Sequence, residues 1–100
     1  MNAIMIGGRL VEKPVFSHEA YGEKFYRFKI ESDRLSDNKD TLECIIPEVL
    51  LSQLDDEVLM SGEIRTRNVF DGTKRRLEIF VFVKEILGFY SNLNTVSIDG

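Results

Sequence analysis

With 100 residues, the chain is long enough for one domain with a modest core and too short for two. Its 43% hydrophobic and 30% charged residues argue against a wholly disordered chain, and no apolar run approaches the roughly 20 residues that span a bilayer. The N-terminus lacks the pattern of a signal peptide, and Cys44 is the single cysteine, which excludes an internal disulfide and a multi-cysteine metal site. We therefore expect a cytoplasmic protein.

The net charge of −4 conceals a segregation of charge along the chain. Residues 31–57 carry nine acids and two bases, whereas residues 1–30 and 62–84 have net charges of +2 and +3. A polyanion responds to the local field of a basic patch rather than to the total, so the acidic sum does not exclude nucleic acid as a partner. The alternative is that these charges only keep two hairpins soluble.

Alternation with a period of two predicts four strands in chain order, at residues 4–10, 25–31, 42–46 and 57–67. The side chains expected to face the core are Ile4, Ile6, Leu10, Tyr26, Phe28, Ile30, Leu42, Cys44, Ile46, Val58, Met60 and Ile64, with Gly8 and Gly62 on the same side. A fifth run, Leu77–Val83, is nearly continuous, which is typical of a strand covered on both faces or placed at a subunit contact.

Turn signals separate these runs at residues 21–23, 36–40 and 71–73, and the Asp71-Gly72 pair favours a hairpin. Between the third and fourth strands, Val49, Leu50 and Leu54 have helical spacing over little more than two turns. This segment predicts a short helix or helical turn.

The fold expected from these elements is an all-β, five-stranded OB-fold barrel with at most a short helix between strands 3 and 4. Closure into a barrel removes exposed strand edges. The alternation ends after residue 86, so we expect a domain over residues 1–86 and a short C-terminal tail over residues 87–100.

Nothing in the sequence predicts an enzyme, a cofactor or a metal site. The single histidine, His18, lies beside Glu19 without a nucleophile motif, and Gly7-Gly8 lacks the spacing of a phosphate-binding loop. Three consecutive acids, at residues 55–57, cannot all face one ion and are expected to form a solvated turn.

Binding of single-stranded nucleic acid needs basic side chains near phosphates and flat side chains on which bases stack. Phe25, Arg27 and Lys29 share the strand face opposite the expected core residues. In an OB barrel, ligands cross the second and third strands between the first-to-second and fourth-to-fifth loops, which are the two basic segments here. The candidate binding residues are Arg9, Tyr21, Phe25, Arg27, Lys29, Arg65, Arg67, Phe70, Lys74, Arg75 and Arg76.

Each candidate also has a structural alternative. Phe25 can cover a barrel end, Tyr21 can pack within its loop, and Phe70 can pin its own hairpin. Arg65 and Arg67 can pair with Glu63 and Glu78. We expect the basic and aromatic groups to converge on one side of the sheet while the acidic middle of the chain turns away.

Three segments resemble the bacterial single-stranded DNA-binding protein family, including its primosomal replication protein n branch. They are Asn2-x-Ile4-x-Ile6-x-Gly8-Arg9-Leu10, Tyr26-x-Phe28-x-Ile30 after a glycine, and Val58-x-Met60-x-Gly62-Glu63-Ile64-Arg65-Thr66-Arg67 followed by Asp71-Gly72 and Arg76. The resemblance covers residues 2–86 and implies sequence-tolerant binding of single-stranded DNA in replication, recombination or repair. It also implies no cofactor, a homodimer or homotetramer built partly through the first strand, and replication proteins as partners.

The chain departs from the family's pattern at its aromatic positions. It has no tryptophan, Glu43 stands where the family often has an aromatic residue, and Val69 precedes Phe70 where another is common. Fewer stacking platforms imply weaker binding. The rival hypothesis is an OB-fold protein–protein interaction module, because Ile45, Leu59, Phe80 and Phe82 fall on or near outward positions and suggest a buried subunit or partner surface.

Overall fold

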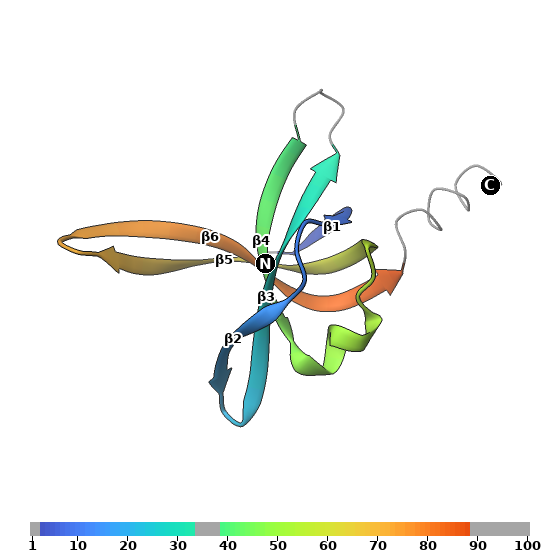
Figure 1. Cartoon of the computed structure of the whole chain (residues 1–100), viewed down its shortest axis with the longest axis horizontal. Helices are drawn as coiled ribbons and strands as arrows, with labels where there is room; N and C mark the ends of the chain where they lie inside the picture. The colour runs from blue at the N-terminus through green and yellow to red at the C-terminus, as the bar shows by residue number, and fades with distance from the viewer. Residues whose placement is uncertain (1–2, 34–38, 89–100) are drawn as a thin grey trace.

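The computed structural model describes residues 3–33 and 39–88. Within them the strands are β1 (Ile4–Leu10), β2 (Val15–Ala20), β3 (Glu23–Asp33), β4 (Lys39–Pro47), β5 (Glu57–Asp71) and β6 (Lys74–Gly88), shown in Figure 1. One short 3-10 helix, η1 (Glu48–Gln53), connects β4 to β5. The predicted all-β class and the short helix between the third and fourth predicted strands are confirmed.

Five of the strands close into a ring. The sheet order is β1-β5-β6-β4-β3-β2, and β1 also pairs with β3 through Arg9↔Glu31 and Leu10↔Ile30. All neighbours are antiparallel except β4 and β6. The ring β1-β5-β6-β4-β3 therefore contains the five predicted strands, and β2 is attached outside it through β3.

The core lies inside this ring. It matches the predicted inward positions of β1, β3, β4 and β5, and β6 adds Val81 and Val83, for which no inward side was predicted. The buried cluster consists of Ile6, Phe28, Ile30, Cys44, Ile46, Val58, Met60, Val81 and Val83, with Ile4, Leu10, Tyr26 and Leu42 packed against it. Ile64 is the exception among the predicted core residues, because β5 has left the ring at this point and the side chain is exposed.

Burial raises the pKa of the Cys44 thiol to about 12, so this cysteine is an inert core residue rather than a nucleophile.

Strand β2 differs from the prediction, because the sequence pattern places residues 15–20 in a connection. The side chains of β2 are exposed or only partly buried on both faces. Because neither face has to be apolar, the segment shows no alternation of apolar and polar residues from which a strand could be predicted. The predicted turn at Tyr21-Gly22 does exist, as the tip of the β2–β3 hairpin, with both residues at positive φ. The predicted turn at 36–40 lies mostly outside the described residues.

The residues of η1 that pack on the core differ in part from those with helical spacing in the sequence. Leu50, Leu51 and Leu54 pack on the core, whereas Val49 is 70% exposed. A 3-10 helix has three residues per turn, so Leu51 and Leu54 share a face where α-helical spacing had selected Val49. Tyr26 Oη also donates a hydrogen bond to Glu48 Oε2 over 3.0 Å, which ties η1 to β3.

The β5–β6 hairpin projects from the ring as a long two-stranded arm, at the left of Figure 1. Its strands pair from Leu59↔Gly88 to Asp71↔Lys74, with Gly72 at φ 70 in the turn. Strand β6 continues through Leu87 and Gly88, two residues beyond the predicted end of the domain at residue 86. Residues 89–100 of that predicted tail lie outside the described residues.

Candidate nucleic-acid interface

One continuous surface crosses the strands β3, β4, β6 and β5 on the side away from the core. The register places Arg27 opposite Ile45, Ile45 opposite Phe82, and Phe82 opposite Glu63. Directly paired residues project from the same side of a sheet, so these side chains form a row across four strands. We call this surface the outer face, made by Phe25, Arg27, Lys29, Glu43, Ile45, Glu63, Arg65, Arg67, Phe80, Phe82 and Lys84.

Three rings form an outer aromatic cluster, which consists of His18, Phe25 and Phe82. The Phe25 and Phe82 ring centroids are 5.7 Å apart at an interplanar angle of 51°. His18 stacks on Phe25 with a centroid distance of 4.9 Å and an angle of 15°. Phe25 therefore lies on the predicted side of β3, but it is only 8% exposed, as in the structural alternative in which it covers other residues.

Cationic side chains lie over these rings. The Arg65 guanidinium carbon is 4.0 Å from the Phe82 ring centroid, and Lys84 Nζ is 5.1 Å from the same ring. Arg67 lies 5.5 Å from the ring centroid of Phe80. Cation–π contacts of this kind hold the cations over the sheet and give Phe80 and Phe82 partners on the side of β6 away from the core.

The arginines also pair with carboxylates, as the structural alternative predicted. Arg65 bonds Glu63 over 2.7 Å, and Arg67 contacts both Glu43 and Glu78, over 3.1 and 3.0 Å. The hydrogen bond from Arg65 lowers the pKa of Glu63. These partners are partly exposed, and exposed ion pairs contribute only about 0–1 kcal/mol, so phosphate groups can replace the carboxylates at little cost.

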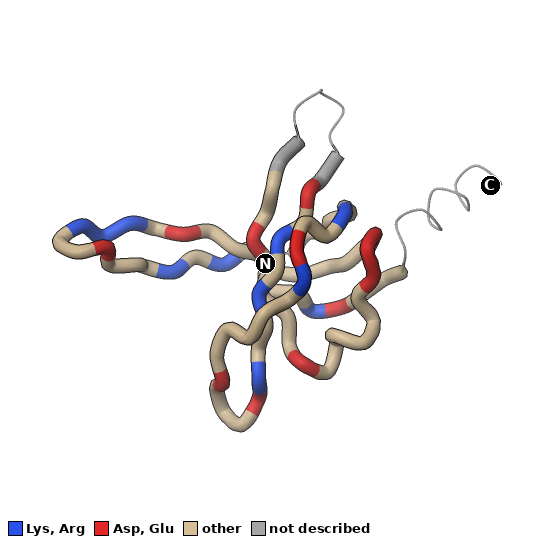
Figure 2. The backbone as a smooth tube through the Cα atoms, in the orientation of Figure 1, with Lys and Arg blue, Asp and Glu red and all other residues tan. Residues whose placement is uncertain are grey.

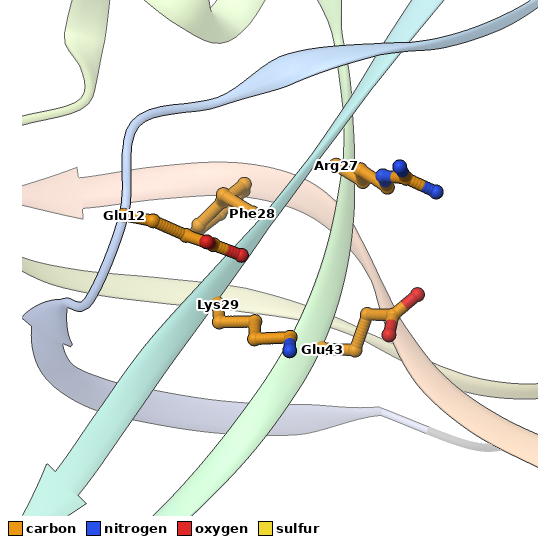
Figure 3. Close-up of a pocket in the computed structure, with 5 residues that line it drawn as sticks. All are labelled: Glu12, Arg27, Phe28, Lys29 and Glu43. Atoms are coloured by element: carbon orange, nitrogen blue, oxygen red, sulfur yellow. The ribbon is translucent and has the colours of Figure 1, made fainter.

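A depression of about 220 Å³ opens between β3, β4 and the segment that follows β1 (Figure 3). Its lining brings together Glu12, Arg27, Phe28, Lys29 and Glu43. Since Glu43 also binds Arg67, the bases of β3 and of the β5–β6 hairpin meet here. Glu43 is an exception to the expectation that the acidic middle of the chain turns away.

The hairpin carries different residues on its two faces. Figure 2 shows Lys and Arg along both strands of this arm. Arg76 bonds Glu78 over 3.1 Å and so shares the face of Arg67. Phe70 and Arg75 pair with each other in register, 5.4 Å from ring centroid to guanidinium, on the opposite face. The prediction that the whole hairpin points toward one surface is therefore wrong for these two residues, since alternate residues in a strand face opposite ways.

Two further candidates lie outside the outer face, and a third lies at its far end. Arg9 is exposed on β1, in register with Glu31 and Glu57. Tyr21 is fully exposed at the tip of the β2–β3 hairpin. Lys74 is exposed beside the turn of the arm and, two residues from Arg76 on β6, lies on the same face as Arg76. The structure thus brings together Phe25, Arg27, Lys29, Arg65, Arg67 and Arg76, and leaves the other candidates at separate points.

Two residues that were predicted to contribute to a subunit or partner surface are covered within the chain itself. Ile45 and Leu59 are 2% and 8% exposed. They are therefore not available to a partner, which removes much of the support for a protein-interaction module. Within the described residues there is no group of three or more His, Cys, Asp and Glu residues placed to hold a metal, and no helix there is long and apolar enough to cross a membrane.

Among solved structures, the chain is similar to the dimeric N-terminal domain of PriB from Thermoanaerobacter tencongensis. The two are 32% identical, the TM-score is 0.69, and the alignment covers 85% of this chain and 92% of that domain. This chain belongs to the SSB/PriB-like OB-fold family. The predicted resemblance and the OB fold are confirmed.

A second similar structure is the complex of Plasmodium falciparum SSB with single-stranded DNA. It has a TM-score of 0.67 at 17% identity, over 82% of this chain and 85% of that one, and therefore supports the fold. No protein-family model and no curated protein matches this SSB/PriB-like chain.

Four residues of the interface in this SSB/PriB-like OB fold were not among the predicted DNA-binding residues. Phe80 and Phe82 were predicted at outward positions, but as part of a subunit or partner surface. Lys84 continues their alternation with the buried Val81 and Val83, and this period of two was the signal that could have added it. His18 gave no such signal, because its position follows from the unpredicted strand β2. Glu43, at a position where an aromatic residue was expected for the family, binds Arg67 instead.

Proposed function

We propose that the chain binds single-stranded DNA with little sequence preference, and that it protects or presents the strand during replication, recombination or repair. The single observation that carries this proposal is the outer face, where an aromatic cluster and cations from β3, β5 and β6 adjoin on one surface. Stacking on rings and charge attraction to phosphates require no particular base. Membership of the SSB/PriB-like family supports the proposal, and the function is binding rather than catalysis.

In this proposal, phosphates are met by the five cations that the structure groups together, Arg27, Lys29, Arg65, Arg67 and Arg76. The path of the DNA extends along the β5–β6 arm, where it meets Lys74, Arg75 and the 68% exposed Phe70. A flexible single strand can contact both faces of this arm. Tyr21 offers a further ring at the β2–β3 tip, and Arg9 a cation on β1. Phe25 contributes from beneath His18 rather than as an open platform.

Titration of labelled oligo(dT) at several salt concentrations tests this function. Each phosphate that a cation neutralises adds about −0.7 to the slope of log K against log salt for a single strand, so five contacts predict a slope of about −3.5. Affinity is then expected to fall about 100-fold between about 50 and 200 mM salt, measured by fluorescence anisotropy. Absence of binding at low salt, or affinity that ignores salt, contradicts the proposal.

We also propose that the chain forms a homodimer, or a homotetramer built from two dimers, partly through β1. One edge of β1 pairs with β5 along Ile4–Arg9, whereas within the described residues its other edge pairs with β3 only at Arg9 and Leu10. Met5 is 66% exposed on this strand. The dimeric state of the similar PriB domain supports pairing of two copies here.

Sedimentation velocity over a wide concentration range measures this assembly. We expect the sedimentation coefficient of a dimer or tetramer at high concentration, with dissociation only on dilution. A monomer at the highest concentration contradicts the proposal without affecting DNA binding.

The remaining parts of the proposal are the domain boundary, the location and the protein partners. We place the DNA-binding domain in the predicted residues 1–86, extended by Leu87 and Gly88 because β6 ends there, and the protein in the cytoplasm. Replication proteins are the proposed partners, in keeping with the family of the chain.

A further inference from the structure

The outermost ring of the aromatic cluster is His18. Its imidazole stacks on Phe25, which is 8% exposed, at an angle of 15°. His18 itself is exposed, so the side of the imidazole away from Phe25 is turned toward solvent. A nucleobase cannot reach the face of Phe25 that His18 occupies unless the histidine moves. The accessible flat surface at this end of the outer face is therefore the imidazole itself.

Two local features fix the orientation of this ring. The β2–β3 ladder shifts register between Phe16 and His18, so that His18 lies directly opposite Phe25. Such a bulge re-aims a side chain relative to regular pairing. In addition, Ser17 Oγ lies 3.0 Å from His18 Nδ1. An exposed side chain held by a stack, a bulge and a polar contact is ordered before a ligand arrives.

We propose that the solvent-facing side of His18 is a stacking platform for an unpaired nucleobase, which extends the DNA path from the ring of strands onto β2. The inference rests on the proposed function. It adds a contact at a residue outside the three segments that resemble the family. A base on this platform continues the series His18, Phe25 and Phe82, whose last ring lies under Arg65. Arg27, two residues from Phe25 and on the same side of β3, lies about 6.6 Å further along the strand, a distance suited to an adjoining phosphate.

A purely structural role, in which His18 only shields Phe25, makes a different prediction. His18→Leu still covers Phe25 but removes the flat π surface, whereas His18→Phe keeps both properties. If bases stack on residue 18, His18→Leu weakens oligo(dT) binding by about 5-fold or more, and His18→Phe changes it by less than about 2-fold. If His18 only shields Phe25, the two variants bind alike.

Fluorescence provides a direct readout, because the chain contains no tryptophan. His18→Trp introduces a single indole at the proposed platform. We expect oligo(dT) to quench its emission, with saturation at the same oligonucleotide concentration as the anisotropy change of the labelled strand. Val49→Trp is the matched control, since Val49 is 70% exposed on η1 and the emission of an indole there is expected to remain unchanged.

The outcomes separate the inference from the function. If the wild-type chain binds oligo(dT) but the emission of the His18→Trp variant is not quenched and His18→Leu binds as tightly as His18→Phe, the platform is refuted and the proposed function stands. If the wild-type chain does not bind at low salt, the proposed function fails and the platform fails with it. If circular dichroism shows that His18→Leu is unfolded, the fluorescence comparison decides whether the platform exists. Quenching of the His18→Trp variant but not of the Val49→Trp variant supports it, and equal responses refute it.

Discussion

Reversing the charge of Arg65 and Arg67 together, as Arg65→Glu and Arg67→Glu, is expected to weaken oligo(dT) binding at low salt by about 100-fold or more. A hydrogen bond to a charged group contributes about 1.5–3 kcal/mol, and the variant loses two of them and adds repulsion. Both arginines lie over rings of the outer face, where the proposed DNA path crosses the sheet. Anisotropy with labelled oligo(dT) measures the change.

The loss is expected to be similar for all base sequences, because phosphate contacts carry no sequence information. The salt dependence is also expected to become shallower by about 1.4, the contribution of two phosphate contacts to a single strand. Urea unfolding should show only a small change in stability, since the ion pairs of both arginines are partly exposed.

A matched control reverses the same number of charges elsewhere. Lys13 and Lys24 are exposed, and Lys24 lies on the side of β3 opposite Phe25 and Arg27. Lys13→Glu with Lys24→Glu should therefore weaken binding far less. Equal losses from both double reversals would mean that net charge, rather than the outer face, controls affinity.

A change in the opposite direction is expected from Glu78→Gln. This substitution frees Arg67 and Arg76 from their shared carboxylate and should strengthen oligo(dT) binding.

Replacing Gly62 by alanine is expected to destabilise the fold by about 3 kcal/mol, because overpacking at a rigid site costs about 1–3 kcal/mol or more. Gly62 lies where β5 approaches β6 across a register shift between Ser61 and Gly62. A Cβ at this position would collide with the carbonyl oxygen of Phe82 and lie 3.1 Å from Val81 Cγ1. A backbone atom cannot move aside without opening the β5–β6 pairing.

Urea unfolding followed by circular dichroism measures this effect, with Gly72→Ala as the comparison. A Cβ at Gly72 meets no atom within 4 Å, but its φ of +70° disfavours any other residue, which costs about 1–2 kcal/mol. Gly62→Ala should therefore lose more stability than Gly72→Ala. The reverse order, or no loss at Gly62, would show that the strands are less closely packed than the structure indicates.

The ring of strands was predictable because a strand with one buried face has apolar residues at every second position. The inward residues of β1, β3, β4 and β5 recur at every second position, and these positions form the core around Phe28 and Met60. Strand β2 shows no such pattern, since neither of its faces is buried. Its sequence therefore predicts a connection rather than a strand.

Which residues share the candidate site depends on contacts between distant segments, and local sequence patterns do not show these contacts. Alternation placed Arg27 and Lys29 on one side of β3, and the register of β5 with β6 then brought Arg67 to Glu43 beside them. The same register turned Phe70 and Arg75 to the opposite face of the arm. The burial of Phe25 was not predictable, because it depends on a ring from β2.

By itself, the sequence determined which side chains enter the core and which elements carry the positive charge, because both follow from the order of residues along a strand. Only the tertiary structure decided which strands became neighbours and at what register. That register joins His18, Phe25, Phe82 and Arg65 into one surface, although they are separated along the chain. Contacts between distant segments arise from ring closure, and local patterns do not record it.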